Sequence, residues 1–283
     1  MRINTNVSSL TAQEAAVNTG KSITTSLEKL STGLRINKAS DDASGLAIAD
    51  KLRTQATSIN QGISNGNSAV SLLQIADKSM SEQSNILDTI KAKLVQANTD
   101  TTSADGRESI RKDINKLLVQ LDNIAAQTNY NGTALLQAAA SANGTAAKGI
   151  MSFQIGEKAA DLVKTATIRS NTAGLSLGSL KGLAANGLTQ TLAGSNQAKI
   201  DKAITTLNGY RGNIGSTQNQ VESAVRNLMT QATNVKAAES IIRDVDYAQE
   251  SANFNKQNII SQAGSYAISQ ANAVQQNVLR LLQ

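Results

Sequence analysis

The clearest pattern in the sequence is an apolar residue at every seventh position of its carboxyl-terminal part. The repeat runs without a gap through Ile200, Leu207, Ile214, Val221, Leu228, Val235 and Ile242. A sustained repeat of this spacing is typical of a helix that packs along another helix. Smaller apolar residues extend the pattern toward the end of the chain, so we predict that residues 200–283 are mostly helical.

A second repeat of the same spacing lies in the first third of the chain. Its members are Ile59, Leu73, Met80, Leu87 and Leu94, with Gly66 at the position between the first two. This register predicts one strand of a coiled coil over residues 45–98. Asp105 and, three residues later, Glu108 indicate a capping box ahead of a shorter helix over residues 107–128.

The amino-terminal segment is also periodic. Its apolar residues form two helical series, Ile3, Val7, Leu10 and Val17 and then Ile23, Leu27, Leu30 and Leu34. Neither arm of the chain can bury its apolar stripe alone, so the arms are expected to pair where the chain doubles back. Helix over residues 200–283 would span roughly 125 Å, against about 50 Å for a compact globule of this length. The expected fold is therefore mainly α, a long antiparallel helical coiled-coil rod built from both ends of the chain.

The middle of the chain differs from both arms. Residues 129–199 contain nine of the 19 Gly residues, which predicts that the long helices stop there and that the next helix covers 197–240. Met151, Phe153 and Ile155 alternate with polar residues ahead of a turn, so we expect a small central β-hairpin. The rest of 129–196, chiefly the stretches 136–148 and 172–196, is expected to form exposed loops without a core of their own.

Composition narrows the possible functions. Aromatic residues make up 2% of the chain, and Cys, His, Pro and Trp do not occur. Without Cys and His the chain lacks the usual nucleophile, the usual general base and the commonest ligands of transition metals. We therefore predict that the protein is not an enzyme and uses neither cofactor nor metal. The absence of Pro also permits long helices and removes slow isomerisation after the chain has been stretched out.

The charge pattern argues against nucleic-acid and membrane partners. The net charge is +6, but Lys and Arg are scattered and there is almost no aromatic surface for base stacking. A basic coiled-coil nucleic-acid binder is a minor alternative. No segment approaches the ~18 apolar residues that span a bilayer, and a membrane-surface helix is only weakly supported. The first residues, 1–6, lack an apolar signal core, so we expect any export to proceed without a cleaved signal peptide.

Several short motifs suggest chemistry but fit structural roles better. Residues 15–22 end in Gly-Lys-Ser, as a phosphate-binding loop does, yet they lack its first Gly and follow helical periodicity. Nucleotide hydrolysis dependent on Lys21 would be needed to support that alternative. Asp41 and Asp42 are interpreted as the start of a helix rather than as metal ligands. The two Asn-Gly-Thr tripeptides, at 131–133 and 143–145, fit the glycosylation pattern but also mark turns.

Small residues are frequent at both ends of the chain. They are Ala12, Ala15, Ala16, Ala263, Ala267, Ala271 and Ala273. Small side chains let helices approach one another closely on more than one side, as a bundle of several subunits requires. A dimeric tether or an intracellular coiled coil does not need such faces, so the pattern favours self-assembly.

Several sequence motifs closely resemble those of bacterial flagellins. The stretch LSTGLRINKASDDASGLAIA matches the amino-terminal signature of that family nearly residue for residue. Further matches cover both ends of the chain and its hairpin, in the segments 30–49, 128–132, 153–156, 238–250 and 277–282. The resemblance is to a short form without large outer domains.

The resemblance implies a structural subunit of the flagellar filament, the helical propeller of bacterial motility. Segments 1–44 and 241–283 would form the inner core of a hollow homo-polymer, surrounded by a rod domain over 45–240. The residues implied in core packing are Ile3, Val7, Leu10, Leu27, Leu30, Leu34, Ile259, Ala263, Val278 and Leu281. Flagellins are secreted unfolded through a type III export apparatus, so the implied partners are that apparatus, an export chaperone, the filament cap and the hook-junction proteins. The flagellar hook–filament junction protein, which has similar terminal helices, is the alternative.

Some positions depart from the family pattern. Gln275 replaces a frequent Pro, and the isoelectric point near 9.5 is unusual for a commonly acidic family. In the segment that the vertebrate Toll-like receptor for flagellin reads, Thr89, Ala92 and Lys93 replace an arginine, an acidic residue and a leucine. We therefore expect weak recognition by this receptor, as for flagellins of the Campylobacter type.

Overall fold

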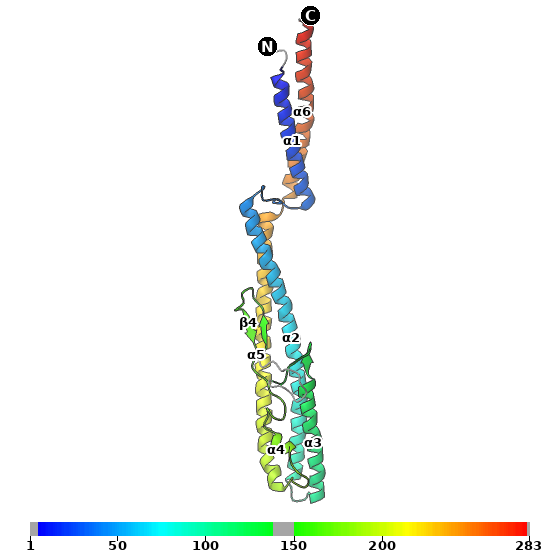
Figure 1. Cartoon of the computed structure of the whole chain (residues 1–283), viewed down its shortest axis with the longest axis vertical. Coiled ribbons are helices and arrows are strands. Elements are labelled where there is room, and N and C mark those ends of the chain that lie inside the picture. Colours follow the sequence, from blue (N-terminus) through cyan, green and yellow to red (C-terminus); the bar gives the residue numbers. More distant parts are fainter. Residues whose placement is uncertain (1–4, 138–149, 282–283) are drawn as a thin grey trace. The chain divides into compact units, whose positions relative to one another are not determined.

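The computed structural model describes residues 5–137 and 150–281, with side chains up to residue 277 (Figure 1). The chain is mainly helical with two small antiparallel sheets, which confirms the predicted fold class. The elements in chain order are α1 (Val7–Thr32), α2 (Ala43–Ala97), α3 (Ala104–Gln127), β1 (Asn129–Tyr130), β2 (Thr133–Ala134), β3 (Ser152–Gln154), β4 (Leu162–Lys164), α4 (Gly178–Lys181), α5 (Gln190–Arg243) and α6 (Tyr247–Leu281).

The chain divides into two compact units. Unit 1 comprises residues 1–56 and 233–283, and therefore holds α1, α6 and the adjoining ends of α2 and α5. Unit 2 comprises residues 57–232, with the remainder of α2 and α5, all of α3 and both hairpins. The helices α2 and α5 thus contribute residues to both units.

Unit 2 contains a continuous apolar core between α2, α3 and α5. A β-carbon on Gly66 of α2 would meet the side chains of Val221 and Val225, so the gap at Gly66 in the apolar repeat of α2 faces α5. Two ion pairs join the two helices, from Arg211 to Asp77 at 2.9 Å and from Lys91 to Asp201 at 2.6 Å. Since contacts at higher numbers in α2 meet lower numbers in α5, the two helices are antiparallel.

Two hairpins lie in unit 2. The predicted hairpin is confirmed: β3 pairs antiparallel with β4, and Phe153 lies opposite Val163. A second, tighter hairpin pairs β1 with β2 through Asn131 and Gly132. Both turn residues have positive φ, 49° and 76°, which Asn and Gly tolerate best. The Asn-Gly at 131–132 is therefore a turn, as one interpretation of the sequence expected, whereas 143–145 lies outside the described residues.

The expectation that 172–196 is an exposed loop without a core was wrong. The segment contains α4, it buries Leu175, Leu177, Leu180 and Leu188, and α5 already begins at Gln190 rather than near 197. These leucines are irregularly spaced, so no period marked them as core residues, yet they belong to the same apolar cluster as residues of α2, α3 and α5. Part of 136–148 is also buried, at Leu136, while 138–149 lies outside the described residues.

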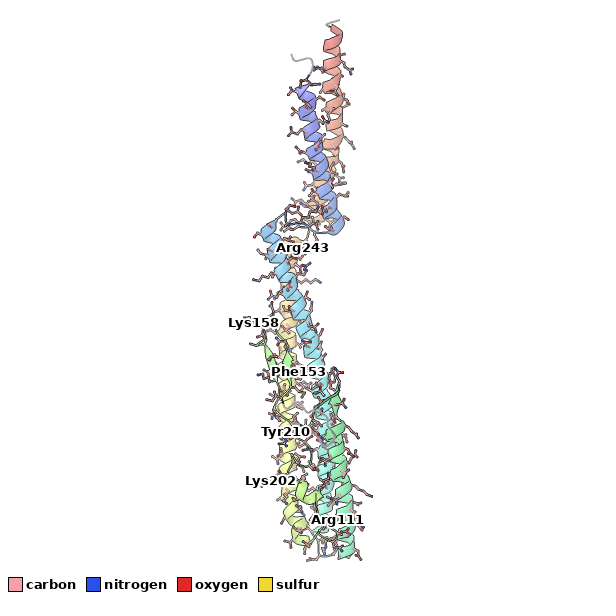
Figure 2. The ribbon with its side chains drawn as sticks, in the orientation of Figure 1. Arg111, Phe153, Lys158, Lys202, Tyr210 and Arg243 are labelled. Carbon is pink, nitrogen blue, oxygen red and sulfur yellow. The ribbon has the colours of Figure 1, made fainter. Side chains whose placement is uncertain are left out.

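The predicted capping box at the start of α3 was also wrong. The N-cap is Ser103, whose hydroxyl accepts a hydrogen bond from the Gly106 N–H at 3.1 Å. Glu108 instead accepts two hydrogen bonds from Arg111, which is labelled in Figure 2. Ser is one of the preferred N-cap residues, so the helix begins three residues earlier than expected.

Candidate assembly surface

The terminal helices α1 and α6 pack along one another in unit 1 (Figure 1). At one end the Asn6 amide donates a hydrogen bond to the Ala271 carbonyl at 3.0 Å. At the other end the Tyr247 hydroxyl donates to the Leu30 carbonyl at 2.6 Å. The low-numbered end of α1 therefore meets the high-numbered part of α6, and the pair is antiparallel.

This helix pair has almost no interior. Among the described side chains of 5–32 and 247–277, the one buried residue is Ser26. Large apolar side chains stand in solvent instead, with Val7 63%, Ile259 67% and Tyr266 73% exposed. Among the described side chains of the two helices, the exposed large apolar residues are Val7, Leu10, Val17, Leu27, Tyr247, Ile259, Ile260, Tyr266 and Val274. We call this set the terminal apolar surface.

The terminal apolar surface is accompanied by few charges. In α1 the ionisable residues are Glu14, Lys21, Glu28 and Lys29, and Asn, Gln, Ser, Thr and Ala occupy most other positions. The composition of α6 is similar. Neutral side chains can be brought against a neighbouring helix without the desolvation cost of a charge. The surface therefore suits close packing against further helices.

Carboxylates organise the ends of the neighbouring helices. Asp42 accepts hydrogen bonds from the N–H groups of Ser44 and Gly45, so it caps α2, which confirms the prediction of a helix start. Asp41 accepts from the N–H groups of Lys38 and Asn37. These backbone hydrogen bonds lower the pKa of Asp41 from its ordinary value.

The residues predicted for the coiled-coil seam lie mostly in the core of unit 2. Buried members are Ile59, Leu73, Met80, Leu87, Leu94, Ile200, Leu207, Ile214, Val221 and Leu228. The last two, Val235 and Ile242, belong to unit 1 and are half-buried. The sequence analysis missed a second row of buried residues on α2, which also recurs every seven positions and consists mostly of small residues. Its members are Gly62, Ala69, Ala76, Gln83, Ile90 and Ala97.

The residues implied in filament-core packing lie in unit 1. Val7, Leu10, Leu27, Ile259 and Ala263 are exposed, whereas Leu30 and Leu34 are half-buried. Ile3 lies outside the described residues, as do the side chains of Val278 and Leu281. Ile260, Tyr266 and Val274 were missed, although their spacing offered a signal: Tyr266 follows Ile259 by seven residues, and Val274 follows Ile260 by fourteen.

The receptor-segment residues lie on α2 in unit 2. Thr89 and Ala92 are exposed, whereas Lys93 is half-buried and pairs with Asp113 at 2.9 Å. Through this hydrogen bond and its charge, Lys93 lowers the pKa of Asp113. Lys93 is thus already engaged within its own chain.

The motifs that suggested chemistry have structural positions. Gly20 and Lys21 lie inside α1, so their backbone amides serve the helix and cannot cradle a phosphate. Within the described residues there is no group of three or more acidic side chains placed to hold a metal ion, and no helix there is long and apolar enough to cross a membrane.

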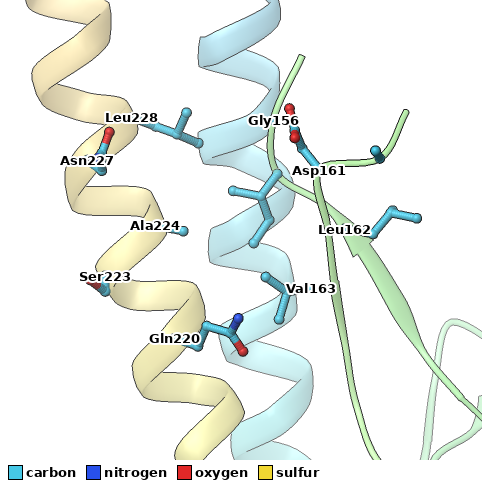
Figure 3. A pocket seen from close by; sticks show the side chains of 11 residues that line it. Gly156, Asp161, Leu162, Val163, Gln220, Ser223, Ala224, Asn227 and Leu228 are labelled. Atoms are coloured by element: carbon cyan, nitrogen blue, oxygen red, sulfur yellow. The ribbon is translucent and has the colours of Figure 1, made fainter. Parts of the chain in front are cut away.

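An open groove of ≈ 600 Å³ runs between the β3–β4 hairpin and α5 in unit 2 (Figure 3). One wall is formed by Asp161, Leu162 and Val163, and the other by Gln220 and Asn227 among others. The groove is open and mixed in polarity, and Asp161 is the one ionisable residue among those that line it.

These features define a class of protein: a coiled-coil structural subunit whose body has its own core and whose terminal helix pair lacks one. Comparison with known proteins gives the family. The model of the bacterial flagellin N-terminal helical region matches residues 3–141, and that of the bacterial flagellin C-terminal helical region matches 197–282. The chain belongs to the bacterial flagellin family.

Relatives of similar length support this assignment. The chain is 35% identical over 303 residues to a flagellin of Bacillus subtilis and 33% identical over 286 residues to the flagellar filament 33 kDa core protein of Treponema phagedenis, each covering 100% of both chains. The crystal structure of Bacillus cereus flagellin, 28% identical, superposes with a TM-score of 0.50 over 62% of this chain and 94% of that chain. The protein is a structural subunit of the flagellar filament.

The hook–filament junction alternative is not favoured. A putative flagellar hook-associated protein from Vibrio parahaemolyticus superposes with a TM-score of 0.58, covering 72% of this chain and 99% of that chain, but is 11% identical. That likeness shows a shared fold alone. The full-length relatives at 33–35% identity are filament proteins.

Proposed function

We propose that the terminal apolar surface on α1 and α6 is where subunits join, and that segments 1–44 and 241–283 form the inner core of a hollow filament. The observation that carries this proposal is the exposure of large apolar side chains on a helix pair without a buried apolar residue among its described side chains. Several large apolar side chains left exposed on one helix pair indicate an interaction site.

The energetic reason is direct. Burying one large apolar side chain contributes about 1.5–3 kcal/mol. In the isolated chain α1 and α6 gain only part of this, because none of their described apolar side chains is fully buried and many of the large ones are exposed. Packing against the same helices of neighbouring copies recovers it, and the small residues such as Ala263 allow close approach. A homo-polymer is therefore the state in which these helices acquire an interior.

Unit 2 has the complementary role. Its residues include ten of the twelve seam residues, all ten of them buried, so the rod domain proposed over 45–240 can fold within one chain and hold the subunit's shape. The seam residues Val235 and Ile242 lie where α5 enters unit 1.

An assembly assay with one position changed tests the proposal. Ile259→Asp places a charge on the terminal apolar surface and should abolish filaments in seeded solutions viewed by electron microscopy. Ile259→Leu keeps the apolar character and should assemble normally. Because residue 259 lies in unit 1, the thermal unfolding of unit 2 should be unchanged in both variants. Normal filaments from Ile259→Asp would refute the proposal.

We further propose that the chain reaches the outside of the cell through the flagellar type III export apparatus and assembles there, with an export chaperone, the filament cap and the hook-junction proteins as partners. Its membership of the flagellin family supports this route. The absence of Pro and Cys supports it physically, because an exported, stretched chain can refold without slow isomerisation or disulfide exchange.

A further inference from the structure

The long carboxyl-terminal helix is interrupted where its own sequence gives little reason for a break. α5 ends at Arg243 and α6 begins at Tyr247. The surrounding run SIIRDVDYAQE, residues 240–250, contains neither Gly nor Pro. Sharp breaks in helices usually coincide with those residues or with a group inserted into the hydrogen-bond ladder.

Residues of the connector between α1 and α2 take the hydrogen bonds that a continuous helix would use. A continuous helix needs the N–H of Val245 and the carbonyls of Ile242 and Arg243. In the structure the Val245 N–H donates to the Gly33 carbonyl at 3.0 Å. The Arg35 guanidinium donates to the Ile242 carbonyl and the Arg35 N–H donates to the Arg243 carbonyl, each at 2.6 Å. Arg243 is labelled in Figure 2.

The relationship is reciprocal at the end of α1. Gly33 ends that helix in the left-handed conformation, with φ 74°. The Leu30 carbonyl, which belongs to the last turn, accepts a hydrogen bond from the Tyr247 hydroxyl at 2.6 Å. Leu34 and Asp244 form an antiparallel bridge between the two connectors. The α1–α2 connector therefore caps the end of α5, and residues at the break between α5 and α6 cap the end of α1.

One local residue also contributes. Asp246 accepts hydrogen bonds from the N–H groups of Ala248 and Gln249, so it caps the start of α6. A local cap satisfies donors of α6 but leaves the carbonyls of Ile242 and Arg243 without partners. Those two acceptors are met by Arg35.

We propose that the break between α5 and α6 is imposed by the connector around Gly33 and Arg35, and that residues 243–247 close into continuous helix when this connector is withdrawn. The break between α5 and α6 then couples the conformations of the two arms of the chain. It forms only when the amino-terminal arm is in place, so docking of one arm changes the backbone of the other. The inference uses contacts within unit 1 and does not depend on which faces of α1 and α6 meet neighbouring subunits.

The rate of amide hydrogen exchange distinguishes this proposal from a general loosening of the break between α5 and α6, because the two predict opposite changes in that rate. As the first residue of α6, Tyr247 has an N–H without a partner in that helix, and a continuous helix would give it the Arg243 carbonyl. Withdrawal of the connector should therefore slow exchange of the amides of 246–249, by about tenfold. If the break were intrinsic to 244–246, the same change would speed exchange.

The experiment uses the full chain in filaments. Each variant is labelled with ¹⁵N and co-assembled as a minor component with unlabelled, unaltered protein, so that mass spectrometry follows the variant alone. Arg35→Ala removes the guanidinium bond, and Arg35→Pro removes the backbone donor as well, so slowing should increase from the first to the second. Lys21→Ala, which also removes a basic side chain from the amino-terminal arm, should leave 246–249 unchanged.

A second variant keeps the test decisive where Arg35 variants do not co-assemble. Asp246→Ala removes the local cap and leaves the connector intact, so the break should persist and the amides of Ala248 and Gln249 should exchange faster. Slower exchange in Asp246→Ala, or faster exchange of 246–249 in either Arg35 variant, would overturn the proposal.

Discussion

The backbone carbonyl of Ile155 lies directly against Gly62 of α2, so close that a β-carbon at position 62 would overlap its oxygen. One turn further along α2, the Asn65 amide donates a hydrogen bond to the Gln154 carbonyl at 3.0 Å. The β3–β4 hairpin therefore packs closely on α2 because Gly62 has no side chain, and the Asn65–Gln154 hydrogen bond holds it there. A Gly inside a helix costs about 1 kcal/mol relative to Ala, so this close packing opposes the helix's own preference.

Gly62→Ala is expected to destabilise unit 2 even though Ala is the better helix former. The added methyl group must displace the hairpin backbone, and overpacking of this kind costs about 1–3 kcal/mol. Gly209→Ala is the matched control, because that position also lies in a helix of unit 2 and has open space around it. The control should gain about 0.5–1 kcal/mol in the free energy of unfolding. Thermal unfolding of both variants checks the prediction, and a stabilised Gly62→Ala would contradict it.

Leu228→Asp is expected to abolish polymerisation by unfolding unit 2 rather than by blocking its surface. Leu228 is buried and lies beside Gly62. Truncation of a buried Leu to Ala costs about 2–5 kcal/mol, and an unpaired buried charge costs more. Leu228→Met, which nearly conserves volume, should cost less than about 1.5 kcal/mol and still form filaments. Circular dichroism measures the folding of each variant, and electron microscopy of the same samples measures its assembly. A Leu228→Asp variant that is folded but does not assemble would contradict the prediction and indicate an interface role for this residue.

The acid response of unit 2 should depend on Glu108. Arg111 donates two hydrogen bonds to its carboxylate and the Asn186 N–H donates a third at 2.8 Å, and together they lower its pKa from 4.5 to about 2. A lowered pKa in the folded state stabilises the fold above about pH 4.5, and this contribution is lost as the pH falls toward 2.

Glu108→Gln should therefore flatten the dependence of the free energy of unfolding on pH between about 4.5 and 2, and should lower stability at neutral pH. Arg111→Gln, which removes the partner, should flatten it too. Denaturant unfolding at a series of pH values measures the slope. Equal slopes in Glu108→Gln and the unaltered chain would show that this carboxylate does not carry the effect.

Recognition by the vertebrate Toll-like receptor for flagellin is expected to be weak and to increase when residues typical of activating flagellins are restored. The combined variant Thr89→Arg, Ala92→Glu and Lys93→Leu should give a stronger response of reporter cells to the soluble monomer. Lys93→Leu alone also breaks the ion pair with Asp113, so thermal unfolding must accompany the assay. A strong response to the unaltered monomer would refute the expectation of weak recognition.

Patterns that repeat many times along the chain predicted the fold best. The long helices follow from apolar residues recurring every seven positions, because each repeat reports the same packed face. The leucines of 172–189 have no regular spacing, and their burial depends on packing against α3. Asp122 of α3 holds this segment by accepting hydrogen bonds from Thr172 and Lys181. Such burial becomes visible only when distant parts of the chain meet.

The same limit applies to the candidate assembly surface. The sequence indicated that the ends of the chain carry apolar stripes, and Ile259 was among the expected residues. Our sequence analysis did not include Tyr266, although this residue follows Ile259 by seven positions. Nor did it indicate the break after Arg243, whose hydrogen-bond partners lie some two hundred residues earlier, at Gly33 and Arg35.

The nearly absent interior of the α1–α6 pair has a thermodynamic consequence. Unit 2 has an apolar core built within one chain, so its melting temperature should be independent of protein concentration. If unit 1 gains its stabilising burial from other copies, as proposed above, its melting temperature should rise with concentration, as for any structure stabilised by association. For the ends of this chain, dissolving the polymer and melting the helices are then a single event.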